Sequence, residues 1–448
     1  MSRSFSGIVR ITNASDYIAP SQACILPLRN EASEEKNPSQ VILHRKDAVL
    51  GSQDLKKRVT VSLNDCLACN GCVTSAESIL IQEQSLPKFL EGLSSNDVSV
   101  VTISPQSLCS IAVKYGLQVS QTAVILARKL MKLGATYIVD SSYARYLSLS
   151  YIYEEFKKKN CADILITSVC PGFVCYAEKV HPELLLPYLS RVRSPQAIMG
   201  SLVKDFLARK HSMPPAKIFH ATVMPCFDKK LEASRNEFNI GFHQVDCVVS
   251  TAEISSLLEE GEDISYSEET VEKVPINWLN SLQKGMVIGM PSEHSGGYAF
   301  YVVHRFLREN LLDSETSNQP RTDFSTNVVK NDKVLITAAK CYGFRNIQNL
   351  VQKLKRGKCT YNFVEVMACP SGCVNGGGQI RAQTVEARSS VLEAVIKEYD
   401  SLQNIPELEN AIEKLTSEWM ELNVHWKDWL FTEFHAVDKD VSLQTMKW

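Results

Sequence analysis

Short apolar runs alternate with amphipathic stretches along the chain from about Asn96 onward. Val98–Ile103 predicts a buried strand. The apolar spacing in Pro105–Tyr115 and Gln121–Leu133 predicts two helices, and Gly134 ends the second. Further short apolar runs predict strands at Tyr137–Val139, Ile164–Thr167, Ile218–Val223, Val245–Ser250, Met286–Gly289, Val334–Ala338 and Phe363–Met367.

Strands that alternate with helical stretches are typical of βαβ units, so the expected fold class is α/β, with parallel sheets covered by helices on both faces. Two polar insertions, Glu259–Lys273 and Asp313–Asn327, interrupt the pattern and predict exposed loops. The charged stretch from Arg29 to Arg58 predicts a surface loop or linker. Functional residues of open parallel sheets gather in the loops after the strands, and chemistry is expected there.

The composition is that of an ordinary soluble globular protein, with 44% apolar and 22% charged residues in a chain of 448. This length corresponds to about three domains. The 48 basic and 50 acidic residues give a formal charge of −2, which provides no electrostatic reason to bind nucleic acid or an anionic membrane. No apolar run reaches the ~18 residues that indicate a membrane span. Met1–Ala14 lacks the apolar core of a signal peptide, so the chain is expected in the cytoplasm.

The 14 cysteines are the most informative residues. A reducing cytosol does not preserve disulfides, so clustered cysteines in such a chain are expected to bind metal or to react. The spacing Cys66-Leu-Ala-Cys69-Asn-Gly-Cys72 resembles the run that holds a 4Fe-4S cluster in bacterial ferredoxins. No fourth cysteine follows directly, and Cys24 is the nearest upstream candidate. Zinc is the alternative metal for these thiolates.

A second set of cysteines lies in three loops that each follow a predicted strand. The first loop is Thr167–Phe173 with Cys170, and the second begins at Met224 and contains Cys226. The third follows Phe363–Met367 and is rich in glycine, which permits close backbone approach. Together the loops contribute enough thiols for a second 4Fe-4S cluster: Cys170, Cys226, Cys369 and Cys373.

The three loops resemble the signature motifs of iron-only hydrogenases, and nearly all of the chain from Asn96 to Lys397 can be laid along their catalytic domain. More closely, the chain is similar to the eukaryotic hydrogenase-like proteins of the Nar and prelamin-A-recognition-factor-like group. The patch Asp16–Pro27 and the single run Cys66–Cys72 are that group's pattern. The resemblance implies a two-lobed hydrogenase-like core of parallel sheets flanked by helices.

The resemblance also implies a component of the cytosolic iron-sulfur protein assembly machinery with two 4Fe-4S clusters. It divides the chain into an N-terminal cluster-binding segment with linker (1–95), the two-lobed core (96–397) and a helical tail (398–448). Carried over by motif, the ligands of the N-terminal cluster are Cys24, Cys66, Cys69 and Cys72. Those of the inner cluster are Cys170, Cys226, Cys369 and Cys373.

One position argues against hydrogenase activity. The first motif of the enzymes has two adjacent cysteines, of which one donates protons, and Val169 stands at that donor position. Valine cannot carry a proton, so a non-catalytic homologue is expected. Phe173 also replaces a tryptophan and Ile380 a proline. The second motif is nevertheless retained at Met224, Lys229 and Glu232. An active hydrogenase or other redox enzyme is one alternative, and a zinc-stabilised interaction protein is the other.

The chain end predicts a partner. Trp448 resembles the aromatic tail by which proteins dock on the cytosolic iron-sulfur targeting complex, with its β-propeller and HEAT-repeat subunits. Lys447 departs from the acidic residue that the family tail favours, and packing of Trp448 against the helical tail around Trp426–Trp429 is the alternative. The implied role is an adaptor or transfer factor between scaffold and targeting complex, which serves apo iron-sulfur proteins indirectly. The expected location is the cytoplasm, with the nucleus as a second compartment.

Overall fold

The computed structural model describes most of the chain beyond residue 80. The described ranges are 41–43, 59–61, 81–159, 163–259, 287–289, 294–312, 315–321, 323–331, 333–382, 384–402 and 408–437.

The first sheet has four strands, all parallel, and confirms the predicted βαβ pattern. In spatial order the strands are β4 (Tyr137–Asp140), β3 (Val98–Ile103), β6 (Ile218–Met224) and β7 (Cys247–Ser250). The strand β3 has the predicted bounds, and β6 is buried at every position. Such strands are buried on both faces, as expected where helices cover a parallel sheet.

The second sheet has five strands and is mixed. In spatial order they are β5 (Leu165–Thr167), β11 (Phe363–Met367), β10 (Lys333–Tyr342), β9 (Phe324–Asn331) and β8 (Glu315–Arg321). The strands β5, β11 and β10 are parallel, whereas β9 and β8 form an antiparallel hairpin. This corrects the prediction of a loop at Asp313–Asn327. An exposed edge strand has no buried face to create alternation, and β8 is polar throughout.

The helices pack around both sheets. In chain order they are α3 (Leu86–Ser95), α4 (Pro105–Tyr115), α5 (Val119–Lys132), α6 (Ser142–Lys158), α7 (Pro171–Val180), α8 (Pro182–Leu185), α9 (Pro195–Ser201), α10 (Ala208–Lys210), α11 (Asp228–Ala233), α12 (Thr251–Glu259), α13 (Tyr298–Asn310), α14 (Phe344–Lys355), α15 (Val385–Asp400) and α16 (Leu408–Leu422). The π-helical turn Leu202–Leu207 joins α9 to α10.

The predicted bounds of α4 are confirmed because both of its ends carry strong signals. The hydroxyl of Ser104 accepts the N–H of Ser107, Pro105 occupies the first turn, and Gly116 ends the helix with φ 64°. The helix α5 begins at Val119, two residues before the prediction, because Gln118 and Gln121 form a capping box there.

One strand prediction is wrong. Residues 287–289 of the predicted strand Met286–Gly289 are not in a sheet, although Val287 and Ile288 are buried. Side chains bind the backbone of Ile288 in place of a neighbouring strand. Its N–H donates to Asp140 Oδ2 at 3.2 Å, and its carbonyl accepts from Ser142 Oγ at 3.0 Å. The apolar run therefore correctly indicates that these residues are buried, but it does not show that they pair with a neighbouring strand.

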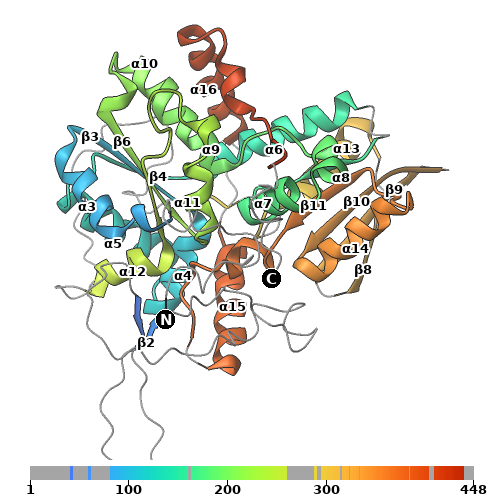
Figure 1. The fold of residues 1–448 in the computed structure, drawn as a ribbon, viewed down its shortest axis with the longest axis horizontal. Coiled ribbons are helices and arrows are strands. Elements are labelled where there is room, and N and C mark those ends of the chain that lie inside the picture. The colour runs from blue at the N-terminus through green and yellow to red at the C-terminus, as the bar shows by residue number, and fades with distance from the viewer. Residues whose placement is uncertain are drawn as a thin grey trace, which may run out of the picture.

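The two sheets stand side by side, with the four-stranded sheet at the left of Figure 1 and the five-stranded sheet at the right. One apolar core includes residues of both sheets, such as Val100 of β3 and Val366 of β11. Another covers the opposite face of the first sheet and includes Val101 and Ile103, because successive residues of a strand point to opposite faces. Two lobes that share a core confirm the predicted α/β fold class.

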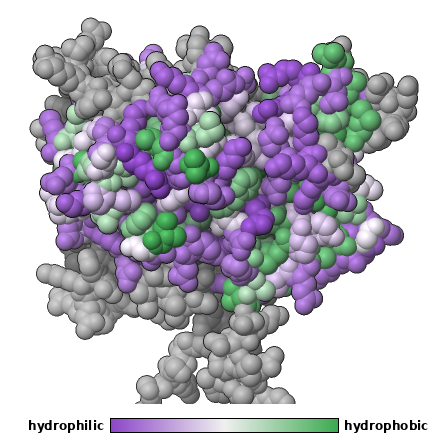
Figure 2. All heavy atoms as spheres, turned by 90° about the horizontal axis from the view of Figure 1, so that it is seen from above, coloured by the Kyte–Doolittle hydropathy of each residue, from purple (hydrophilic) through white to green (hydrophobic). Residues whose placement is uncertain are grey.

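The remaining described parts are peripheral. The strands β1 (Val41–Leu43) and β2 (Val59–Val61) form an antiparallel pair, and β1 lies in the stretch that predicted a loop. The helix α16 is anchored to the shared core by Trp419, which is completely buried. Among the described residues, no helix has the length and apolar character that a membrane crossing requires. The face in Figure 2 is mainly hydrophilic, with separate hydrophobic spots.

Candidate metal centre

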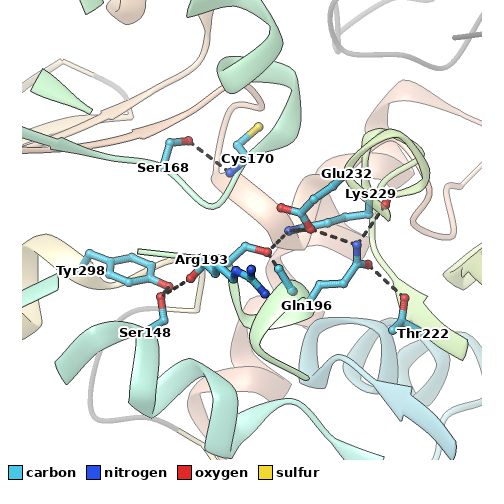
Figure 3. Close-up of polar contacts among 11 residues, drawn as sticks. Ser148, Ser168, Cys170, Arg193, Gln196, Thr222, Lys229, Glu232 and Tyr298 are labelled. Atoms are coloured by element: carbon cyan, nitrogen blue, oxygen red, sulfur yellow. Dashed lines mark hydrogen bonds and ion pairs between the residues drawn. The ribbon is translucent and has the colours of Figure 1, made fainter. Parts of the chain in front are cut away.

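Cys170 lies where β5 passes into α7 and is the N-cap residue of that helix. Its backbone N–H donates to Ser168 Oγ at 3.1 Å, and the same hydroxyl donates to the carbonyl of Val366 at 2.7 Å (Figure 3). Because Val366 belongs to β11, Ser168 ties the Cys170 loop to the neighbouring parallel strand. The position of the Cys170 loop therefore depends on a contact with the second sheet and not only on interactions within the loop.

Cys226 follows β6 and precedes α11, so it comes from the other sheet. The segment after Cys373 packs directly against the backbone of Cys226 and the residue before it. Gly378 N–H donates to the carbonyl of Pro225 at 2.9 Å, and a β-carbon at Gly378 would lie 3.2 Å from Cys226 Cα. A β-carbon at Gly376 would lie only 2.2 Å from the Pro225 oxygen. The glycines of the third loop thus permit the close approach that the sequence suggested.

Cys369 and Cys373 come from the turn after β11. Ser371 has φ 57° and Gly372 has φ 70°, so the chain bends sharply between the two cysteines. Ser295 holds this bend, because its hydroxyl donates to the Ser371 carbonyl at 2.9 Å and accepts the Val374 N–H at 3.2 Å. The bend places both thiols at the carboxyl edge of the second sheet.

The structure brings the four thiols into one group. The backbone N–H of Ala368 donates to Cys170 Sγ at 3.5 Å, which places the first loop beside the third. A thiolate at one of the four positions raises the pKa of its neighbours in the set, and each of the other three raises that of Cys226 from the opposite sheet, so the four side chains lie near one another. The site therefore lies between the two sheets, at the carboxyl ends of β5, β6 and β11.

Burial is the largest influence on these thiols. It raises the pKa of Cys170 to about 12 and the pKa of Cys373, and it raises the pKa of Cys226 and of Cys369 well above the ordinary value. The cause is desolvation of the charged form. Such thiols stay protonated at neutral pH unless a strong positive charge, such as bound metal, stabilises the thiolates.

The donor set fits an iron-sulfur cluster. All four cysteines are free thiols. Among the described parts of the chain, no three His, Cys, Asp or Glu side chains are grouped as around a single metal ion. In a cluster, each thiolate binds a different iron, so the four sulfurs do not need to surround one ion. Backbone N–H groups of the glycine-containing loops are also available to cluster sulfides.

Charged side chains surround the four thiols. Two of them, Asp228 and Arg145, were not predicted from the sequence. Asp228 is 4% exposed, and burial raises the pKa of its carboxyl to about 6, although Lys229 opposes the shift. Arg145 from α6 is 5% exposed and donates to the carbonyl of Gly296 at 2.7 Å and to the Tyr399 hydroxyl. The proximity of Asp228 to Cys226 in sequence was an available signal. Arg145 offered none, because it lies far from every cysteine along the chain.

The residues retained from the second hydrogenase motif form a buried polar group (Figure 3). Lys229 Nζ lies 2.8 Å from Glu232 Oε2 and donates to Ser194 Oγ at 3.0 Å. The same carboxylate oxygen accepts from Gln196 Nε2 at 2.9 Å, and Thr222 donates to the Gln196 carbonyl oxygen at 3.0 Å. Lys229 is therefore an anchored, paired cation and not a surface lysine.

Val169 lies immediately before Cys170 and is 8% exposed. It belongs to the shared core, in contact with apolar side chains. A hydrocarbon at this position has no proton to exchange, so the side chain offers no relay beside the thiols.

The other predicted residues have different outcomes. Cys24, Cys66, Cys69, Cys72 and Trp448 lie outside the described residues. Of the described cysteines outside the proposed ligand sets, Cys109, Cys247 and Cys341 have no exposed surface, whereas Cys175 and Cys359 are partly exposed.

Comparison with known proteins agrees with this geometry. The model of the family described as iron only hydrogenase large subunit, C-terminal domain, matches residues 97–377. An apo FeFe-hydrogenase from Chlamydomonas reinhardtii has a similar fold, with a TM-score of 0.63 and 23% sequence identity over 78% of this chain and 98% of the hydrogenase chain. The fold class is therefore that of the iron-only hydrogenases.

Curated relatives show which family within this fold class the chain is similar to. A probable cytosolic Fe-S cluster assembly factor of Brugia malayi is 49% identical over 97% of this chain and 96% of its own length. One of Caenorhabditis elegans is 45% identical over 99% of both chains, and the rat protein named cytosolic iron-sulfur assembly component 3 is 40% identical over 100% of both. The chain belongs to this family of hydrogenase-like cytosolic Fe-S cluster assembly factors, as the motifs indicated.

Proposed function

We propose that this protein acts in cytosolic iron-sulfur protein assembly and binds an inner 4Fe-4S cluster at the four grouped thiols. The observation that carries the proposal is the mutual proximity of Cys170, Cys226, Cys369 and Cys373 across two sheets. The names of the full-length relatives support the assembly role. A bound cluster supplies one-electron redox chemistry or a transferable iron-sulfur unit. The chain holds the thiols in place and keeps them out of bulk water.

The second proposed cluster belongs to the N-terminal segment, at Cys24, Cys66, Cys69 and Cys72. The spacing from Cys66 to Cys72 supports it. The proposed organisation is a cluster-binding segment (1–95), the two-lobed core (96–397) and the helical tail (398–448). With one cluster in the first part and one in the second, the chain is suited to link a scaffold that supplies clusters to a complex that delivers them.

The proposed partner is the cytosolic iron-sulfur targeting complex, with Trp448 as the docking residue. Tryptophan side chains are common anchors of protein–protein interfaces, which supports this assignment. Apo iron-sulfur proteins are reached through that complex, and the proposed location is the cytoplasm and the nucleus.

The protein is proposed to be a non-catalytic homologue of the hydrogenases. Val169 supports this, because it replaces a proton-carrying side chain by a hydrocarbon next to Cys170. Hydrogen evolution from iron-replete protein with a strong reductant, or infrared bands of iron-bound carbon monoxide and cyanide, would contradict this part of the proposal.

The test of the ligand sets is iron and labile sulfide per chain, measured on anaerobically purified full-length protein. Two clusters require about eight irons and about eight sulfides per chain. Cys66→Ala and Cys373→Ala are each expected to lose about half, because each removes a ligand of one cluster only. Cys359→Ala is the matched control, since Cys359 is a partly exposed cysteine outside both sets, and it should keep the full content. Zinc without sulfide would instead support the zinc-stabilised alternative.

A further inference from the structure

The carboxylate of Asp228 lies where the first and third cysteine loops meet. A β-carbon at Gly172 would be 2.8 Å from Asp228 Oδ2 and 3.7 Å from the β-carbon of Ala368. Gly172 follows Cys170 by two residues, and Ala368 directly precedes Cys369. Asp228 also begins α11, two residues after Cys226. The negative charge thus lies beside three of the four thiols and is almost completely buried.

Arg145 lies on the side of the fourth thiol. Its guanidinium donates to the carbonyl of Gly296 at 2.7 Å. The adjacent residue Ser295 packs against the turn that carries Cys373, because a β-carbon at Gly372 would be 2.4 Å from Ser295 Cβ. Ser295 also accepts the N–H of Val374, the residue after Cys373. This chain of contacts connects the buried guanidinium to the Cys373 corner.

We propose that the inner site is electrically polarised, with Asp228 on its negative side and Arg145 on its positive side. These two positioning residues shift the reduction potential of the proposed inner cluster in opposite directions. The inference rests on the proposed function, because it requires that the cluster is bound.

The direct effects on the thiols agree with this arrangement. After burial, Asp228 is the largest influence that raises the pKa of Cys170 and of Cys226, and it also raises that of Cys369. At Cys373, Lys229 and Arg145 lower the pKa, and their effects exceed the opposing effects of Glu365 and Glu232. Lys229 is held in the ion pair with Glu232 that belongs to the retained second motif, so Arg145, which lies outside the motifs, is the residue tested.

The physical reason is the charge that reduction adds. A cluster with four thiolates becomes more negative when it accepts an electron, which a nearby carboxylate opposes and a nearby cation favours. Charges act strongly over short distances in a poorly solvated site. Net charge and hydrogen bonding around a cluster are established determinants of its potential. Asp228 is therefore expected to lower the potential, and Arg145 to raise it.

The experiment is a redox titration followed by electron paramagnetic resonance, on the full-length Cys66→Ala chain at pH 8. This background removes the signal of the N-terminal cluster. Asp228→Asn is expected to raise the potential and Arg145→Met to lower it. Each change should alter the reduction equilibrium about tenfold, equivalent to about 59 mV for one electron. Asp228→Glu and Arg145→Lys keep the charge and should restore the parental potential.

Controls and iron content make the outcome decisive. Asp428→Asn and Arg308→Met change the same residue types at exposed positions, with 82% and 68% side-chain exposure, and should leave the potential unchanged. Shifts in one direction for both test variants, or no shift in a chain that retains its iron and sulfide, would overturn this inference alone. A parental chain without iron and sulfide would overturn the proposed function as well. If Arg145→Met loses its cluster, Arg145→Gln removes the same charge with a polar side chain and takes its place, and Asp228→Asn tests the negative side independently.

Discussion

Gly376 shows how one missing β-carbon makes the inner site possible. Its φ is −62°, which any residue adopts, so its backbone conformation does not require glycine. The requirement is steric, because a β-carbon would lie 2.2 Å from the carbonyl oxygen of Pro225. Pro225 precedes Cys226, so this contact sets the distance between the loops of the two sheets.

Replacing Gly376 by alanine should force these loops apart. We expect Gly376→Ala to cost about 1–3 kcal/mol of unfolding free energy, as overpacking does, and to lower inner-cluster iron. Denaturant unfolding and iron content provide the measurements.

The control is Gly357→Ala. Gly357 has φ 60° but open space around it, so only its backbone conformation is strained, at a cost of about 1–2 kcal/mol. This control should retain its iron. Normal iron content in Gly376→Ala would show that the loops adapt to the added atom and that the close approach is not required.

At the scale of elements, the segment 431–437 packs where α7 and α11 are joined by an ion pair. These two helices follow the loops of Cys170 and Cys226. Glu178 near the end of α7 accepts both terminal nitrogens of Arg235, which follows α11, at 2.9 and 2.7 Å. The same Glu178 carboxylate accepts the N–H of His435 at 3.2 Å, and its backbone carbonyl accepts that of Val437 at 3.2 Å. The C-terminal segment therefore lies on an ion pair that bridges the two sides of the site.

This bridge predicts a large effect of a single truncation. Glu178→Ala removes the bidentate partner of Arg235 and leaves Glu237 as its remaining ion-pair partner, so it should cost about 1–3 kcal/mol of unfolding free energy. The double variant Glu178→Leu with Arg235→Met should cost clearly less, because the charge that it leaves without Arg235 is that of Glu237, whose side chain is 25% exposed to water. Urea unfolding of both variants measures the difference. Equal losses in the two variants would mean that apolar packing, and not the ion pair, holds the segment.

At the scale of the whole molecule, stability depends on a polar group in the middle of the first sheet. His220 of β6 is completely buried. Its Nδ1 donates to the carbonyl of Gln244 at 2.9 Å, so Nε2 accepts the hydroxyl of Thr102 at 3.0 Å. Burial lowers the pKa of His220 from 6.5 to about 4, because the charged imidazolium would lose its hydration inside the sheet.

The pH dependence of unfolding follows from this shift. Between pH 6.5 and pH 4, His220 is protonated in the unfolded chain but neutral in the folded chain. His220 therefore contributes full stability above pH 6.5, and about 3 kcal/mol of it is lost as the pH falls to 4. Comparing urea unfolding of wild type and His220→Gln at pH 7.5 and 5 isolates the contribution. The variant should lose less stability than wild type on acidification, and parallel losses would contradict the assignment.

Local features of the sequence account for many of the predictions that the structure confirms. The bounds of α4 depend on Ser104, Pro105 and Gly116, which act within one or two turns of the chain. The strand β11 is a continuous buried run, so hydrophobicity alone locates it. The hairpin was missed because its edge strand β8 contains no apolar run. The strand predicted at residues 287–289 is wrong although the run is apolar, because side chains hydrogen-bond to the backbone of Ile288 in place of a neighbouring strand.

The amino-acid sequence by itself determined which thiols are available and that each follows a strand, because motif spacing and apolar runs are properties of neighbouring residues. It also determined that position 169 holds a hydrocarbon, which has no proton to donate in any fold. Only the tertiary structure decided which charges face the thiols. Arg145 is distant from every cysteine along the chain, and it comes near the site where its guanidinium donates to the carbonyl of Gly296. Such placement depends on long-range packing, which no local pattern encodes.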